Sequence, residues 1–159
     1  MWKYVRTFLS LRPSMMLLII EAFLYLGWAR ILKARPFAKV APGLGVQMEE
    51  TPLSRDRANE QLLLRISKAL HMVSRHTWWE SKCMVMAMAG MKMLERRRIE
   101  STLYMGTGKD DNGRMIAHAW LRSGIIYLTG ADEIPKYTVV AKFRKTIVNN
   151  ENQRSTSNG

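Results

Sequence analysis

The spacing of apolar residues changes partway along the chain, and this change constrains the fold more than any other feature. Before residue 100, apolar side chains recur every three to four residues, which is the period of an α-helix. After it they tend to alternate with polar ones, which is the period of a half-buried β-strand. The pattern predicts an α+β fold with N-terminal helices, one more helix carrying the single cysteine, and then an antiparallel sheet.

Three helices are expected in the first part of the chain, over residues 13–33, 54–75 and 80–98. Pro13 suits the first turn of a helix, and Pro36 prevents that helix from continuing. A link containing proline and glycine follows at residues 41–45.

This link predicts the organisation of the chain. An N-terminal helical region would cover residues 1–45, and a compact domain would cover residues 46–148. The polar segment 149–159 contains few apolar residues, and we expect it to be disordered.

Four strands are expected in the second part, over residues 101–105, 115–122, 125–129 and 137–143. A turn at Ser123 and Gly124 would join the middle two and pair Arg122 with Ile125. Counting back from that pair places Thr129 opposite His118, and the same register places Tyr127 opposite Trp120.

The chain is strongly basic, with a net charge of +12 and 47% hydrophobic residues. The basic residues are scattered and no nucleic-acid motif accompanies them, so we interpret most of them as solvated faces and helix ends rather than a nucleic-acid interface. A single cysteine excludes an internal disulfide and a multi-cysteine zinc site. No metal-ligand spacing or phosphate-binding loop stands out, so neither a metal nor a cofactor is expected. A lone thiol favours the reducing cytoplasm.

The apolar run 15–29 raises the question of a membrane segment. Its helix would be about 22 Å long, shorter than the roughly 30 Å hydrocarbon core of a bilayer. Glu21 falls in its middle, where a charge is costly in lipid. We therefore predict a buried or partner-facing helix, with peripheral membrane contact as the alternative.

Cys83 is the first candidate for chemistry. It is expected in the first turn of a helix, where unpaired backbone N–H groups and the helix dipole favour a thiolate. The same N–H groups could bind the oxyanion of a tetrahedral intermediate. The alternative is that the thiol is a small hydrophobic group in the core.

His118 is the second candidate, because it lies in a predicted strand between the small residues Ala117 and Ala119. A histidine on a sheet facing a cysteine at a helix start can act as a general base, although a buried histidine can also be purely structural. Asp132 is the nearest carboxylate in sequence that could orient the imidazole, with Thr129 and Glu133 as alternatives.

Four segments carry a resemblance to a known family. Trp-Glu-Ser-Lys-Cys-Met-Val-Met-Ala at 79–87 resembles the nucleophile helix of the transglutaminase-like cysteine proteases of lasso-peptide biosynthesis. Ala-His-Ala-Trp at 117–120 resembles their histidine strand, and Tyr-Thr-Val-Val-Ala-Lys-Phe at 137–143 is similar to the stretch after it. Glu-Ala-Phe-Leu-Tyr-Leu-Gly-Trp-Ala-Arg at 21–30 resembles the split form of lasso peptide biosynthesis protein B, in which the protease is a separate chain.

The resemblance implies a bacterial leader peptidase that cuts a ribosomally made precursor peptide. A separate leader-binding protein would present the precursor, and an ATP-dependent cyclase would act on the product. Cys83 would be the nucleophile and His118 the general base. The family's third catalytic residue is an aspartate; Asp132 is the candidate here, while Thr129 occupies the position that aligns with it.

Two other functions remain open from the residues alone. One is transglutaminase-type acyl transfer, in which an amine replaces water as the acceptor. The other is a non-catalytic helical protein that binds a membrane or a partner through residues 15–32.

Overall fold

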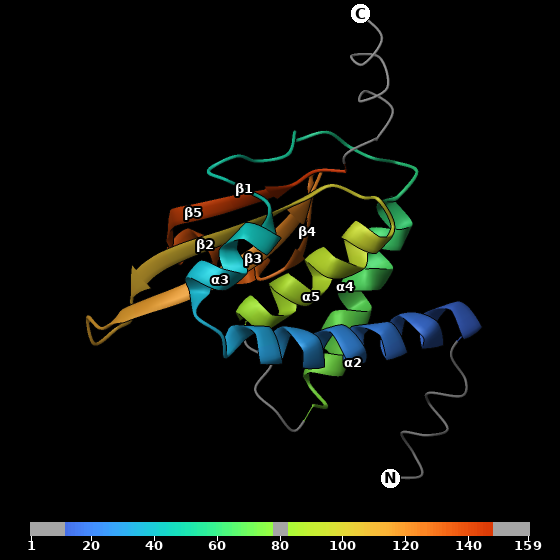
Figure 1. Ribbon diagram of the computed structural model, residues 1–159, viewed down its shortest axis with the longest axis horizontal. Coiled ribbons are helices and arrows are strands. Elements are labelled where there is room, and N and C mark those ends of the chain that lie inside the picture. The colour runs from blue at the N-terminus through green and yellow to red at the C-terminus, as the bar shows by residue number, and fades with distance from the viewer. Residues whose placement is uncertain (1–11, 78–82, 148–159) are drawn as a thin grey trace, which may run out of the picture.

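The computed structural model describes residues 12–77 and 83–147, and Figure 1 shows its layers. The predicted tail 149–159 lies outside the described residues. Helices cover one face of a five-stranded antiparallel sheet, which confirms the predicted α+β fold.

The helical layer has two tiers. α4 (Glu60–Ser74) and α5 (Cys83–Arg96) pack on the sheet, and α2 (Pro13–Lys33) packs across both of them on the outside. α2 begins and ends as its sequence predicts, with Pro13 in its first turn and basic residues in its last. The predicted boundary at residue 45 stays a prediction, although α2 contributes to the same hydrophobic core as α4 and α5.

The link expected at residues 41–45 is wrong, because residues up to Leu44 are helical. α3 (Phe37–Leu44) buries Val40 and Leu44, which are four residues apart and so lie on one face of the helix. Phe37 packs edge-on against Phe143, with ring centroids 6.0 Å apart. This burial outweighs the helix-breaking tendency of the proline and glycine within the segment.

The sheet has the order β1-β5-β2-β3-β4 and is antiparallel throughout. Its strands are β1 (Val46–Gln47), β2 (Ser101–Lys109), β3 (Met115–Ser123), β4 (Ile126–Thr129) and β5 (Thr138–Lys145). A 3₁₀ helix, η1 (Ala131–Lys136), connects β4 to β5.

Gly90 lies where α5 packs closely on the sheet and on α4. A Cβ atom at this position would lie 2.7 Å from Leu121 Cδ2 and 3.0 Å from Leu70 Cδ1. Leu121 therefore points toward α4 and α5, and its neighbours Trp120 and Arg122 point to the opposite face of the sheet.

The register predicted between β3 and β4 is wrong. Ser123 pairs with Ile126 and Arg122 with Tyr127, and an irregularity then places Thr129 opposite Leu121. The turn consists of Gly124 and Ile125, one residue later than expected. Gly124 adopts a φ of 54°, and a Cβ atom there would lie 2.4 Å from the backbone oxygen of Ser54. The packing of a distant loop thus determines where the chain turns.

Candidate functional site

Cys83 is the first residue of α5 and is half-buried. Its side chain packs against the edge of the hydrophobic core. The preceding residues 78–82, including Lys82, lie outside the described residues. α5 is therefore described from Cys83 onward, and the first N–H groups of a helix have no partner within it.

His118 lies on β3, and its side chain is only 9% exposed. The imidazole is stacked between two aromatic rings, with centroids 4.9 Å from Tyr137 and 5.8 Å from Trp120. Successive residues of a strand point to opposite faces of the sheet. Leu121 packs on the helices, and Ala119 lies on the same face as Leu121. The imidazole of His118 therefore projects from the other face of β3. The two rings limit how far the imidazole can turn.

Gly130 supplies the hydrogen bond that orients the imidazole. The Nε2 atom of His118 lies 2.9 Å from the backbone oxygen of Gly130. A carbonyl oxygen only accepts hydrogen bonds, so a neutral imidazole in this contact carries its hydrogen on Nε2. Nδ1 then has a free lone pair, which is what a general base requires.

The hydrogen bond to His118 requires a glycine at residue 130. Gly130 adopts a φ of 73°, and a Cβ atom at this position would lie 2.7 Å from the Ala119 oxygen and 2.9 Å from His118 Nε2. Only glycine can therefore hold its carbonyl in this place without displacing the imidazole.

The candidates for the third position lie at different distances from the imidazole. Glu133 Oε2 is 3.8 Å from His118 Nδ1, and this side chain is 51% exposed. Asp132 is exposed on η1 and, within the described part of the chain, makes no hydrogen bond or ion pair with His118. Thr129 is buried opposite Leu121, and its hydroxyl has no hydrogen-bond partner among the described residues. The assignment of Asp132 stays a prediction; among the described residues, the polar groups beside the imidazole nitrogens are the Gly130 carbonyl and the Glu133 carboxylate.

Tyr137 contacts His118 and is close enough to Cys83 for the two side chains to interact electrostatically. Burial raises its pKa, and the nearby negative charges of Glu133 and then Cys83 raise it further. Its ring meanwhile stacks on His118. Over the described residues, no hydrogen bond joins the Cys83 thiol to the imidazole directly. Tyr137 thus stacks on His118 and lies within electrostatic range of Glu133 and Cys83. Its sequence pattern predicts a strand and indicates no role in a site.

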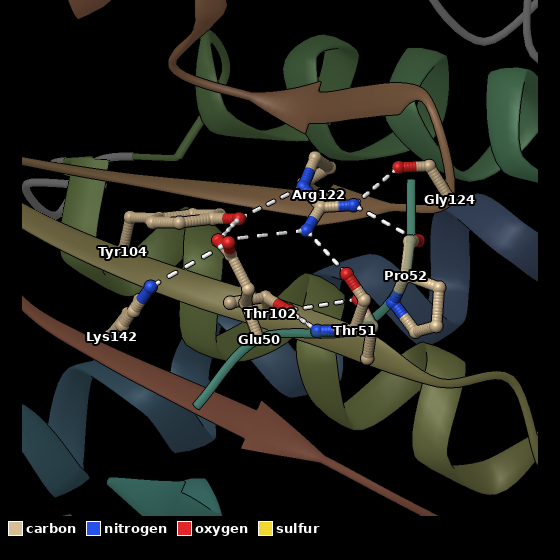
Figure 2. A network of polar contacts seen from close by, with 8 residues as sticks. All are labelled: Glu50, Thr51, Pro52, Thr102, Tyr104, Arg122, Gly124 and Lys142. Carbon is tan, nitrogen blue, oxygen red and sulfur yellow. Dashed lines mark hydrogen bonds and ion pairs between the residues drawn. The ribbon is translucent and has the colours of Figure 1, made fainter. Parts of the chain in front are cut away.

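A buried arginine anchors the strand that carries His118, as Figure 2 shows. The Arg122 side chain is 1% exposed and donates hydrogen bonds to the backbone oxygens of Thr51, Pro52 and Gly124. Its Nε also donates to the Tyr104 hydroxyl at 2.9 Å. These bonds fasten the loop before α4 to the sheet.

Glu50 completes this network. The Tyr104 hydroxyl donates to Glu50 Oε2 at 2.7 Å, and Lys142 Nζ lies 3.6 Å from Oε1. The hydrogen bond from Tyr104 lowers the pKa of Glu50, with Lys142 and Arg122 adding to the effect. Burial, together with the bond to Glu50, raises the pKa of Tyr104 to about 12.

The arginine network and His118 are joined by a row of stacked rings. Arg122 lies over the ring of Tyr104, and Tyr104 stacks on Trp120 with centroids 5.5 Å apart and an interplanar angle of 9°. Trp120 in turn stacks on His118. The sequence pattern predicts that His118, Trp120 and Arg122 share one face of β3. It contains no signal that Arg122 is buried and lies at one end of the row of rings.

The described residues contain no group of three or more His, Cys, Asp or Glu side chains that could hold a metal ion. Their arrangement instead provides a thiol, an oriented imidazole and a carboxylate. These groups are suited to nucleophilic attack on an acyl carbon with proton transfer.

Comparison with known proteins identifies one family. The model of the transglutaminase-like superfamily matches residues 23–142, a segment that runs from α2 to β5 and includes Cys83 and His118. No curated protein and no solved structure matches the chain.

Proposed function

Because the chain belongs to the transglutaminase-like superfamily, we propose that it is a cysteine peptidase that removes the leader from a lasso-peptide precursor. Superfamily membership is consistent with either a cysteine peptidase or an acyltransferase. Cleavage of a leader rests on the resemblance of residues 79–87 and 117–120 to the lasso-peptide proteases.

The observation that supports an enzyme most strongly is the state of the imidazole. The hydrogen bond to Gly130 leaves Nδ1 of His118 as the available base, and Glu133 lies on the same side of the ring. A neutral imidazole with a free Nδ1 beside a carboxylate has the groups that a general base and its charge partner require.

In the proposed reaction, the Cys83 thiol comes within reach of His118 Nδ1 as the substrate binds, because no hydrogen bond joins the two among the described residues beforehand. His118 Nδ1 then takes the proton from the thiol. The thiolate attacks the scissile carbonyl carbon, and unpaired N–H groups at the start of α5 stabilise the resulting oxyanion. His118 then protonates the leaving nitrogen, the C–N bond breaks, and a thioester remains on Cys83.

Hydrolysis completes the cycle. His118 accepts a proton from water as the oxygen attacks the thioester carbon. The C–S bond then breaks and the sulfur regains its proton. Glu133 would stabilise the imidazolium that forms in both halves of the reaction.

The partners are part of the same proposal. A separate leader-binding protein would deliver the precursor, and an ATP-dependent cyclase would use the freed core peptide, all in the cytoplasm. Asp132 is retained as the alternative to Glu133 for the third catalytic role.

The test combines the purified chain, a candidate precursor and a leader-binding protein, followed by mass spectrometry. Free leader and core peptides that appear with the native chain but not with Cys83→Ala support the proposal. A product joined to an added amine, without hydrolysis, would instead identify an acyltransferase.

A further inference from the structure

The outer face of α2 carries a strip of exposed apolar side chains. Leu17, Leu24 and Ile31 are 67%, 64% and 66% exposed, and Ile20 and Trp28 fill the spaces between them. Steps of three and four residues keep all five on one side of the helix. α2 is the outermost helix in Figure 1, and the exposure of these five side chains shows that this side faces away from the other described residues. We call these five residues the α2 strip.

A pocket lies beside the α2 strip, between α2 and the end of α5. Its volume is about 580 Å³, and its walls include Leu17, Leu24, Trp28 and the end of α5 at Arg96. It therefore adds apolar surface beside the exposed strip and does not include Cys83 or His118.

Basic residues border the α2 strip on both sides. Arg12 and Arg30 are both exposed, and they are separated by a whole number of helical turns, so they lie along one edge. On the other edge, Lys92 Nζ lies 5.9 Å from the centre of the Trp28 ring, and the Arg96 side chain is 67% exposed. Lys92 also pairs with Glu95.

α2 has one carboxylate, Glu21, which is buried and forms ion pairs with Arg97 and, at 3.6 Å, with Arg96. No acidic side chain of α2 faces Arg12 and Arg30 on the other edge. An apolar strip between basic edges matches the surface of an anionic bilayer, where acyl chains lie beneath negatively charged headgroups.

α2 is also long and apolar enough to span a membrane by length and composition, with a mean hydropathy of 1.8 over its most apolar window. However, Ala22, Leu26 and Ala29 on its inner face are fully buried in the protein core. Spanning would require these side chains and the Glu21–Arg97 pair to leave their partners. The structure therefore favours a helix that lies in the plane of the membrane surface.

We propose that the α2 strip docks this protein on an anionic lipid bilayer. Leu17, Leu24 and Ile31 enter the boundary between headgroups and acyl chains, while Arg12 and Arg30 contact lipid phosphates. A second copy fits less well, because pairing two strips would bring the basic edges of two chains of net charge +12 together.

The test is sedimentation of the full chain with phosphatidylcholine vesicles, with and without about one-third phosphatidylglycerol. Binding is expected to be at least about tenfold tighter to the anionic vesicles and to weaken in roughly 0.5 M salt. The double variant Leu24→Gln, Ile31→Gln keeps the charge unchanged and is expected to lower binding about tenfold or more.

Two further variants separate docking through the α2 strip from a general effect of exposed apolar surface or of net charge. Met115→Gln changes an equally exposed apolar residue on the β2–β3 hairpin and is expected to bind as the native chain does. Arg12→Gln with Arg30→Gln is expected to weaken binding to anionic vesicles and reduce its salt dependence. Circular dichroism and the melting temperature establish that each variant is folded.

Three results would overturn the proposal. They are equal binding to vesicles without anionic lipid, an equal loss of binding in Met115→Gln, and an absence of vesicle binding. In the last case, a dimer disrupted by Leu24→Gln, Ile31→Gln would identify a second copy as the occupant. Loss of acidic-peptide binding in that variant would identify a peptide.

Discussion

The imidazole Nε2 of His118 is held by the backbone oxygen of Gly130 at 2.9 Å, a contact that requires no side chain at residue 130. A main-chain carbonyl thus occupies the position in which a triad places a carboxylate or amide. This contact places the hydrogen of the neutral imidazole on Nε2, so Nδ1 is the nitrogen that can act as the base.

Gly130→Ala is expected to lower the cleavage rate about 100-fold, because the added Cβ would displace the imidazole from its oriented position. Gly113→Ala is a matched control. Gly113 has a φ of 75°, close to the 73° of Gly130, but a Cβ atom added there would meet nothing within 4 Å. Both variants should lose about 1 kcal/mol of folding free energy to backbone strain. Gly130→Ala should lose more than this, because its Cβ would lie 2.7 Å from the Ala119 oxygen. Only Gly130→Ala should lose activity, and a similar loss in Gly113→Ala would contradict the role of the carbonyl.

Cys83→Ala is expected to lower precursor cleavage by about 10³-fold or more, since no other group can form the thioester. Cys83→Ser retains a nucleophilic atom but should also be nearly inactive, because a hydroxyl ionises far less readily than a thiol. Intact-mass measurement of the native chain with an electrophilic substrate analogue should show one adduct. An adduct that persists in Cys83→Ala would exclude this nucleophile.

The pair Glu133→Gln and Asp132→Asn tests the third catalytic position with adjacent residues of η1. Glu133 lies 3.8 Å from Nδ1 and is half exposed, so its loss is expected to lower kcat about 3- to 10-fold with little change in KM. If Asp132 has no role, Asp132→Asn will match the native rate. A larger loss in Asp132→Asn than in Glu133→Gln would favour the aspartate.

Tyr104 makes stability sensitive to alkaline pH. Its pKa is raised to about 12 in the folded protein, above the value of roughly 10 in an unfolded chain. Between these two values the Tyr104 hydroxyl keeps its proton in the folded protein and loses it in the unfolded chain. The contribution of Tyr104 to the free energy of unfolding is therefore fully present below pH 10 and is lost as the pH rises through 12. The difference in urea midpoint between the native chain and Tyr104→Phe should narrow over this range.

Below pH 9, Tyr104→Phe should itself cost about 1 to 2 kcal/mol, because Arg122 and Glu50 both lose a hydrogen-bond partner. Tyr127→Phe serves as the control, since Tyr127 is 43% exposed and no such network surrounds it in the described structure. A constant difference between native and Tyr104→Phe midpoints from pH 9 to pH 12 would contradict this account.

Elements whose signals are local could be predicted from the sequence alone. Pro13 and the apolar spacing that follows it placed α2, and the change of period near residue 100 predicted the antiparallel sheet. The same local signals placed Cys83 in the first turn of its helix and His118 within a strand. Such signals suffice because helix and strand periods are set by backbone geometry over a few residues.

The way in which these elements pack together depends on contacts in the three-dimensional structure. The turn at Gly124 depends on the backbone of Ser54, and the orientation of His118 depends on the carbonyl of Gly130. Burial of Val40 and Leu44 made a helix of a segment whose composition indicates a loop. Each of these outcomes rests on contacts between segments that are separate in the chain or on a backbone atom that every residue has. The residue types alone therefore carry no signal for them.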